Sequence, residues 1–348
     1  MNIATRLGID LPIIQAPMAG VQDGALAAAV CASGGLGSLP CAMLSLAALR
    51  EQLQALTSRT GGRCNVNFFC HTPASPDEAR EARWRARLDT YYKEYGIDES
   101  QAAPAPARSP FSQEAAELLA QFRPAVVSFH FGLPPPELLG RVKEWGAIVL
   151  STATTLDEAR WLEARGVDAI IAQGLEAGGH RGTFLDEDLS GQMGTFALVP
   201  QIARATSVPV IAAGGIADAR GVAAAMALGA AGVQVGTAYL LCPEATTRAA
   251  HRAALEGPRA SRTVLTNLFS GGAARGIPNR LTDELGPFDE HAPRFPRAAQ
   301  ALAPLRAAAE LAGRDDFSPL WAGQNATGCR RIPAAQLTRE LMLPAPVL

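Results

Sequence analysis

The chain has 348 residues, of which 48% are hydrophobic and 18% are charged, and its formal net charge is −2. This length allows one large barrel of roughly 250 residues and an additional subdomain of about 80–100 residues. Because the chain carries no strong electrostatic field, neither nucleic acid nor an anionic membrane is expected as a partner.

The N-terminal segment lacks the basic region and the apolar core of a signal peptide. The longest mostly apolar stretch, 222–235, is too short and too rich in Gly and Ala to span a bilayer. Both observations favour a cytoplasmic protein.

Short apolar runs alternate with helical patterns along the chain, which indicates βα units and a parallel sheet. Most runs are continuously apolar, as expected of strands that are buried on both faces. Eight runs qualify as strands: 12–16, 36–39, 64–68, 125–129, 147–151, 168–172, 208–213 and 232–235. Eight such units predict a closed (β/α)8 TIM barrel, and a doubly wound sheet is the structural alternative.

The clearest helical patterns fill gaps between these strands. They lie at 24–32, 45–56, 156–165 and 218–228. The last pattern begins with Asp218, a suitable N-cap, and stops at Gly229, so both of its ends carry helix boundary signals.

Two long stretches interrupt the βα rhythm, and each follows a predicted strand. The first carries the prolines Pro73, Pro76, Pro104, Pro106 and Pro110. Both stretches leave the barrel at the face where loops build active sites. We predict a helical cap subdomain at 71–120 and 243–317, over a barrel formed by 1–70, 121–242 and 318–348. A decorative insertion or an oligomer contact is the alternative.

Polar or glycine residues recur where predicted strands end. The first strand is followed by Ala16, Pro17, Met18, Ala19 and Gly20, and the later strand ends carry Asn67, His130, Gln173, Gly214, Gly215, Gly236 and Thr237. The carboxyl ends of barrel strands meet on one face, so this recurrence predicts the catalytic face.

A phosphate site is expected at the seventh and eighth strands. The segments AAGGI and QVGTAY place glycines where backbone N–H groups can approach an anion, and Thr237 adds a hydroxyl donor. Barrels often bind phosphate with these two loops. No P-loop or Rossmann fingerprint is present.

The segment EAGGH ends in His180, the main candidate for catalysis. Gly178 and Gly179 remove side chains that would block a flat ligand, and histidine transfers protons near neutral pH. His130 would face the site or be a hydrogen-bonded core residue. His71, His251 and His291 lie in or beside the irregular stretches and are expected at the surface.

Metal binding and nucleophilic hydrolysis have no support in the sequence. There is no H-E-x-x-H motif, no short-range cluster of His with carboxylates and no G-x-S-x-G elbow. The cysteines form no C-x-x-C pair, so free, mostly buried thiols are expected. They are Cys31, Cys41, Cys64, Cys70, Cys242 and Cys329.

Together these segments resemble the nitronate monooxygenase family, formerly grouped as 2-nitropropane dioxygenases, and its class I members in particular. The resemblance spans about 12–326. Its motifs are PIIQAPMAG, NVNFF, SFHFGLP, AQGLEAGGHRG, AAGGI, QVGTAYL and PLWAGQNA.

The resemblance implies FMN as the cofactor. The backbone of Ala16, Pro17 and Met18 would lie beside the flavin ring, and Asn67 and Gln173 would hydrogen-bond to it. The ribityl phosphate would be held by Gly178, Gly215, Gln234, Val235, Gly236 and Thr237, with Gly179 and Gly214 in the same loops. His180 matches the catalytic base and His130 a second pocket histidine, whereas Gln324 and Arg275 are looser matches.

The activity that the resemblance implies is oxidation of alkyl nitronates with O2 to carbonyl compounds and nitrite. The expected partners are a small nitronate and O2, and a homodimer is a candidate assembly. One alternative is an FMN-dependent enoyl reductase that uses NAD(P)H, and another is a non-redox phosphate-binding barrel enzyme. A flavin-binding protein without catalysis also stays open.

Overall fold

The computed structural model describes residues 3–98 and 108–344. Parts of the predicted barrel and cap segments, including Pro104 and Pro106, lie outside the described residues. Within them, no helix is long and apolar enough to cross a membrane.

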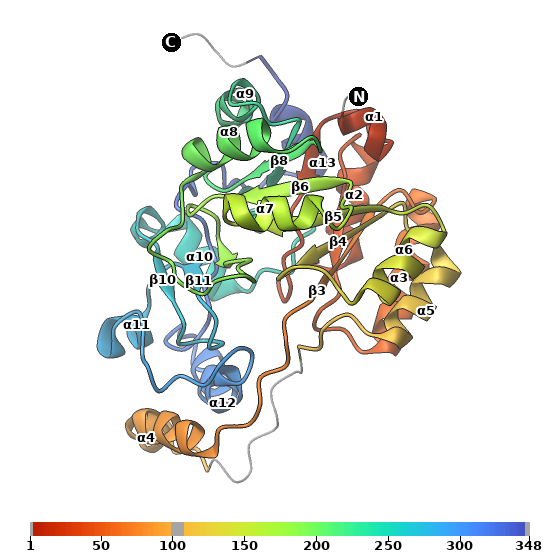
Figure 1. The fold of residues 1–348 in the computed structure, drawn as a ribbon. Coiled ribbons are helices and arrows are strands. Elements are labelled where there is room, and N and C mark those ends of the chain that lie inside the picture. Colours follow the sequence, from red (N-terminus) through yellow and green to blue (C-terminus); the bar gives the residue numbers. More distant parts are fainter. Residues whose placement is uncertain (1–2, 99–107, 345–348) are drawn as a thin grey trace.

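Eight parallel strands form the central sheet (Figure 1). They are β1 (Ile13–Gln15), β2 (Ser38–Pro40), β3 (Asn65–Phe69), β4 (Val126–His130), β5 (Ile148–Ala153), β6 (Ala169–Gln173), β8 (Val210–Ala213) and β9 (Gly232–Val235). Their order is β1-β9-β8-β6-β5-β4-β3-β2. All eight predicted strands are confirmed.

The residues before β2 close the sheet into a barrel. Leu36 N donates to Ile13 O at 2.8 Å, and Gln15 N donates to Leu36 O at 2.9 Å. These bonds join the two edges of the sheet, so the (β/α)8 TIM barrel is confirmed over the doubly wound alternative.

Helices surround the barrel (Figure 1). They are α2 (Gly24–Ala32), α3 (Leu46–Thr60), α5 (Gln113–Phe122), α6 (Pro136–Glu144), α7 (Leu156–Glu163), α8 (Thr195–Ala205), α9 (Ala219–Ala227) and α13 (Ala334–Glu340). The C-terminal helix α13 packs against α2 and so completes the ring. The short α1 (Ile3–Leu7) contributes Ile3 and Leu7 to a core cluster with Ile14, Leu150 and Ile211.

Local signals in the sequence place these helices. The Asp218 side chain accepts from Gly221 N at 2.9 Å, as expected of an N-cap, and Gly229 follows α9 with a left-handed φ of 99°. A Cβ on Gly37 would lie 1.9 Å from Ala27 O, so only glycine lets α2 pack this closely on the entry to β2.

A second core lies away from the barrel, between α4 (Glu78–Glu94) and α12 (Ala298–Leu311). Trp84 and Leu305 are buried in it. Trp84 Nε1 donates to Ala298 O at 3.3 Å, and Tyr92 OH donates to Ala301 O at 2.6 Å. The two irregular stretches of the sequence therefore pack on each other (Figure 1).

The remaining elements come from the second stretch and from the segment after β6. They are η2 (Thr237–Leu241), α10 (Ala249–Glu256), η3 (Pro258–Ser261), β10 (Val264–Thr266), β11 (Ala274–Gly276), α11 (Arg280–Leu285) and β7 (Gly179–His180). The strands β10, β11 and β7 form a separate three-stranded antiparallel sheet.

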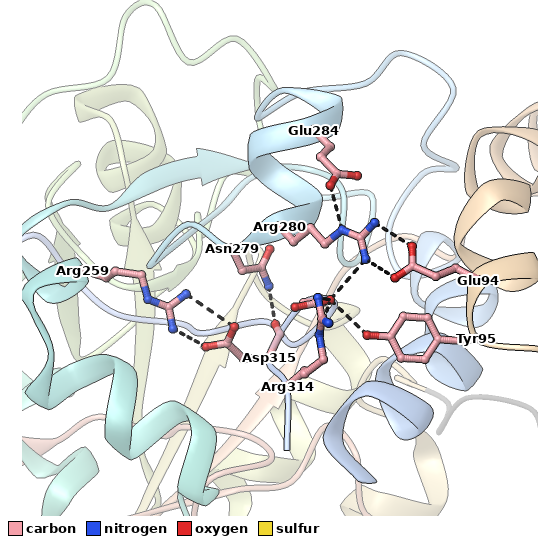
Figure 2. A network of polar contacts seen from close by, with 9 residues as sticks. Glu94, Tyr95, Arg259, Asn279, Arg280, Glu284, Arg314 and Asp315 are labelled. Carbon is pink, nitrogen blue, oxygen red and sulfur yellow. Dashed lines mark hydrogen bonds and ion pairs between the residues drawn. The ribbon is translucent and has the colours of Figure 1, made fainter. Parts of the chain in front are cut away.

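A polar network around Arg280 ties α4 to this second stretch (Figure 2). Arg280 donates to both oxygens of Glu94 at 2.7 Å and to Glu284 at 2.7 Å. Tyr95 OH donates to Asp316 at 3.0 Å, and Asp316 also pairs with Arg280 and Arg314.

The predicted cap segment 71–120 does not act as one unit. Whereas α4 packs on α12, α5 packs on α3 and α6, and its Ala116 and Leu119 lie in the barrel core. The division into barrel and cap stays a prediction. The packing supports a cap built on α4 and α12, with α5 grouped with the barrel.

Candidate active site

A cavity lies at the carboxyl ends of the barrel strands, and all but one of the predicted site residues line it. These are Ala16, Pro17, Met18, Asn67, His130, Gln173, Gly178, Gly179, His180, Gly214, Gly215, Gln234, Gly236 and Thr237. The exception is Val235, whose side chain is buried in the barrel core and whose carbonyl accepts from Ala16 N at 2.8 Å. Val235 therefore joins β9 to the chain after β1, behind the cavity wall.

The backbone of His180 is fixed by the segment that follows the barrel. Its strand, β7, pairs antiparallel with β11, with His180 opposite Ala274. Arg181 N continues the pairing by donating to Ala273 O at 2.8 Å. The predicted glycine-rich loop is thus the edge of a small sheet.

The two glycines before His180 act differently. A Cβ on Gly178 would lie 2.5 Å from Gly323 N, so Gly178 permits a close approach of two backbones. Gly179 has a left-handed φ of 73°, and a Cβ there would meet no atom within 4 Å. Gly179 therefore leaves open space beside His180.

The ring of His180 lies among aromatic side chains and close to one hydroxyl group. The ring centroids of Phe295 and Trp321 are 5.0 and 5.5 Å away. Nε2 lies 2.8 Å from Ser270 Oγ, and among the described residues nothing bonds Nδ1. Burial lowers the pKa of His180 well below its usual value, and the Arg108 cation lowers it further. The ring is therefore an unprotonated base at neutral pH.

His130 is held between two partners. Nε2 lies 3.2 Å from the carbonyl oxygen of His180, and Nδ1 lies 3.1 Å from Thr152 Oγ1. Because a carbonyl only accepts, Nε2 carries the proton and Nδ1 accepts from Thr152. Burial lowers the pKa of His130 to about 4, so this ring is also neutral.

The two predicted flavin-binding amides already have partners in the protein. Asn67 Nδ2 donates to Ser128 Oγ at 2.9 Å. Gln173 Nε2 donates to His180 O at 3.0 Å, and its Oε1 accepts from Gly182 N at 2.9 Å. Gln173 thus supports the His180 segment, and its contact with a flavin stays a prediction.

Unused backbone donors gather at the predicted phosphate loops. Gly214 and Gly215 have φ values of 117° and 72°, which glycine adopts without strain. Among the described residues, nothing accepts from the backbone N–H groups of Gly215, Ile216 and Gly236. Thr237 Oγ1 accepts from Gly323 N at 2.9 Å, and nothing in the described part of the chain accepts its hydroxyl proton.

Comparison with known proteins gives the family. The sequence profile described as nitronate monooxygenase matches residues 2–343. This chain belongs to the nitronate monooxygenase family. The resemblance seen in the sequence is confirmed.

Individual relatives agree with the family profile. A nitronate monooxygenase of Pseudomonas aeruginosa is 46% identical over 342 residues, which cover 97% of this chain and 96% of that protein. A nitronate monooxygenase of Paraburkholderia phytofirmans is 44% identical, with 96% of this chain and 92% of that protein covered. The structure of a nitroalkane oxidase from Streptomyces ansochromogenes superposes with a TM-score of 0.88 at 38% identity, with 97% of this chain and 96% of that chain covered. The expected function and enzyme class agree with these names.

Enzymes of the nitronate monooxygenase family are flavin-dependent, and the cavity fits a flavin that carries a phosphate. The free N–H groups at Gly215, Ile216 and Gly236 suit the phosphate. Gln234 Oε1 is buried without a partner in residues 3–98 and 108–344, and Gln234 lines the same cavity. Such an unsatisfied acceptor suits a ligand that brings its own N–H or O–H donor.

Several residues around the cavity were not predicted. Arg108, Phe69, Trp321 and Asn325 line it, and Ser270 contacts His180. Trp321 and Asn325 lie in PLWAGQNA, one of the motifs that carry the family resemblance, so the sequence indicated this segment but not these two residues. Arg108 and Ser270 stand in irregular segments without local pattern, so nothing in the sequence singles them out.

The prediction that His251 lies at the surface is wrong. His251 is 5% exposed, lines the cavity and has its pKa lowered to about 4 by burial. It shares the buried face of α10 with Ala254 and Leu255. These residues are spaced three and four positions after His251, and this helical spacing in the sequence could have predicted that His251 is buried. His71 is partly buried against Phe295 (4.9 Å between ring centroids), and His291 is also partly buried.

The two looser matches lie outside the cavity lining. Arg275 is buried and donates from Nε to Leu175 O at 2.9 Å, so it supports the loop before His180. Gln324 is exposed, and its backbone N donates to Glu176 O at 2.9 Å.

The other polar groups show no sign of metal chemistry. The described residues contain no group of three or more His, Cys, Asp or Glu side chains that could hold a metal ion. The cysteines are free, with Cys41, Cys64 and Cys242 buried and Cys31, Cys70 and Cys329 partly buried. Burial raises the pKa of the Cys64 thiol to about 12, so that group stays protonated and unreactive.

Proposed function

We propose that this chain is an FMN-dependent nitronate monooxygenase, which oxidises alkyl nitronates with O2 to carbonyl compounds and nitrite. The observation that carries the proposal is the neutral imidazole of His180 in a cavity that also offers unused backbone donors for a phosphate. The names of the relatives at 46% and 44% identity support the same reaction.

In this proposal FMN supplies the redox chemistry when it is bound. The N–H groups of Gly215, Ile216 and Gly236, together with the Thr237 hydroxyl, would hold its phosphate. The chain at Ala16, Pro17 and Met18 would border its ring, and Gln234 would offer an acceptor. Gly179 would leave room for the cofactor, whereas Gly178 and Gly214 allow neighbouring parts of the chain to pack closely around it.

The protein contributes a base and a dry pocket. His180 removes the α-proton when the substrate arrives as a neutral nitroalkane, because its lowered pKa leaves the ring free to accept a proton. His130 and Gln173 hold the His180 backbone through its carbonyl oxygen. Phe69, Phe295 and Trp321 surround the imidazole and exclude water from it.

Two measurements test the proposal. The purified protein is expected to be yellow and to release FMN, not FAD, on denaturation. It is also expected to consume O2 and form nitrite when an alkyl nitronate is added. A colourless protein that FMN cannot reconstitute would contradict the cofactor and favour the non-redox barrel alternative.

Anaerobic mixing with NADH or NADPH tests the reductase alternative. The sequence has no dinucleotide-binding fingerprint, so we expect that NADH and NADPH do not reduce the flavin and that its absorbance spectrum stays unchanged. Rapid bleaching of the flavin, without nitrite formation in air, would support the enoyl reductase instead. A cytoplasmic location and a homodimer belong to the same proposal, and sedimentation of the purified protein tests the second.

A further inference from the structure

Arg108 is the one residue of the described cavity lining whose side chain is cationic at neutral pH. The described lining contains no Asp or Glu, and the buried histidines His130 and His180 are neutral. A mostly buried cation in such a wall is costly unless a ligand brings the compensating negative charge.

Five other arginines of the cap region have a carboxylate partner within the protein. Ion pairs join Arg87 to Asp289, Arg280 to Glu94, Arg297 to Glu81, Arg306 to Glu310 and Arg314 to Asp316. Among the described residues, no carboxylate pairs with Arg108. Its guanidinium instead lies over the ring of Phe295, 5.9 Å from the centroid.

Arg108 lies near His180, the proposed catalytic base, and not at the loops that are predicted to bind phosphate. Phe295, the ring below the guanidinium, is also 5.0 Å from the His180 ring. Burial lowers the pKa of Arg108, but its ordinary value is so high that the side chain stays charged at neutral pH. An anion bound to Arg108 would therefore lie over Phe295, next to His180.

We propose that Arg108 binds the two nitro oxygens of the nitronate and holds the anion beside His180. This inference rests on the proposed function. A nitronate spreads one negative charge over two coplanar oxygens, which matches the planar N–H pairs of a guanidinium. When a neutral nitroalkane binds, its α-C–H bond breaks, the proton passes to the His180 imidazole, and the electron pair moves onto the nitro oxygens that face Arg108.

Equilibrium binding of nitrate, a planar and unreactive oxyanion, tests the inference without turnover. The purified holoenzyme is titrated by calorimetry, and FMN content and circular dichroism show that each variant is folded and loaded. Arg108→Met, which keeps the stem but loses the charge, is expected to weaken nitrate binding about 10- to 100-fold. Arg108→Lys should lose less, because it keeps the charge without the planar pair of donors.

The matched control is Arg83→Met, an exposed arginine of α4 outside the cavity lining. It should bind nitrate as the wild type does. With Arg108→Met, the KM for a nitronate should rise at least about 10-fold, while that for the neutral nitroalkane rises less. Unchanged nitrate binding and nitronate KM in folded, FMN-loaded Arg108→Met would overturn the inference. Arg108-dependent nitrate binding in a protein that forms no nitrite would uphold the anion site and overturn only the proposed reaction.

Discussion

Nε2 of His130 donates to the backbone carbonyl of His180 across 3.2 Å, and the same oxygen accepts from Nε2 of Gln173 at 3.0 Å. The ends of β4 and β6 thus converge on one peptide group of β7. Because Nδ1 of His130 accepts from Thr152, both nitrogens of that ring are in use. This geometry supports the proposal that His180 abstracts the proton, and it suits His130 to a positioning role.

Replacement of the base separates proton abstraction from oxidation. His180→Asn keeps a polar side chain but removes the base, so activity with a neutral nitroalkane should fall about 10²- to 10⁴-fold. A supplied nitronate is already deprotonated, so its oxidation should fall much less. Oxygen uptake with both substrates at equal FMN occupancy measures the difference. Equal losses would mean that His180 binds substrate without abstracting its proton.

The hydroxyl of Ser270 should orient the base. The Ser270 oxygen lies 2.8 Å from Nε2 of His180. The other ring nitrogen, Nδ1, has no hydrogen bond among the described residues. Ser270→Ala should lower kcat with a nitroalkane about tenfold, in line with the loss of one hydrogen bond, with little change in KM. Ser270→Thr, which keeps the hydroxyl, should recover most of the rate. A Thr variant as slow as the Ala variant would argue that side-chain volume is the relevant property.

Buried neutral histidines should make the fold sensitive to acid. Burial lowers the pKa of His130 and of His251 to about 4, whereas the unfolded chain takes up these protons near pH 6.5. The stability that they contribute is complete above about pH 6.5 and is lost as the pH falls to about 4. Each such histidine accounts for about 3 kcal/mol over this range.

Urea unfolding between pH 7 and pH 4.5 measures this dependence. His251→Gln should flatten the decline of the unfolding free energy with falling pH, even if its stability at pH 7 is reduced. His251 is suited to the test because its substitution leaves both the base and His130 in place. A pH profile parallel to that of the wild type would show that His251 is not a source of the acid sensitivity.

Loss of the Arg280 network should loosen α4 locally (Figure 2). Arg280→Met removes the bonds to Glu94 and Glu284 and the contact with Asp316. Amide hydrogen exchange in residues 78–94 should become faster, because part of the connection between α4 and the second stretch is lost. Helix α9 in the same sample is the internal control. Equal acceleration in α9 would indicate global destabilisation instead.

The barrel and about half of the cavity lining followed from local sequence patterns. Buried strands produce continuous apolar runs, and the residues that follow them necessarily meet on one face. For this reason Asn67, Gln173 and Gly215 could be placed together without a structure. Val235 differs from these residues because it is still within β9 and its side chain lies in the core, so its contact with a phosphate stays a prediction.

The remaining wall of the site could not be predicted because distant segments build it. Ser270 reaches His180, and Arg108 reaches the neighbouring Phe295, only through tertiary packing of irregular chain, which has no periodicity to detect. The burial of His251 was detectable, since α10 repeats buried residues at helical spacing. The packing of α4 on α12 joins the two irregular stretches, and neither stretch alone contains a pattern that predicts this contact.

The pairing of β7 with β11 has a consequence for the order of assembly during synthesis. All eight barrel strands leave the ribosome before β11 does, since β9 ends at Val235 and β11 begins at Ala274. Until then the His180 segment lacks the strand beside it, as well as Ser270 and Trp321. A nascent chain that ends after β9 would therefore carry His180 on an unpaired edge, and the cavity around this residue would be complete only when the last third of the chain has been translated.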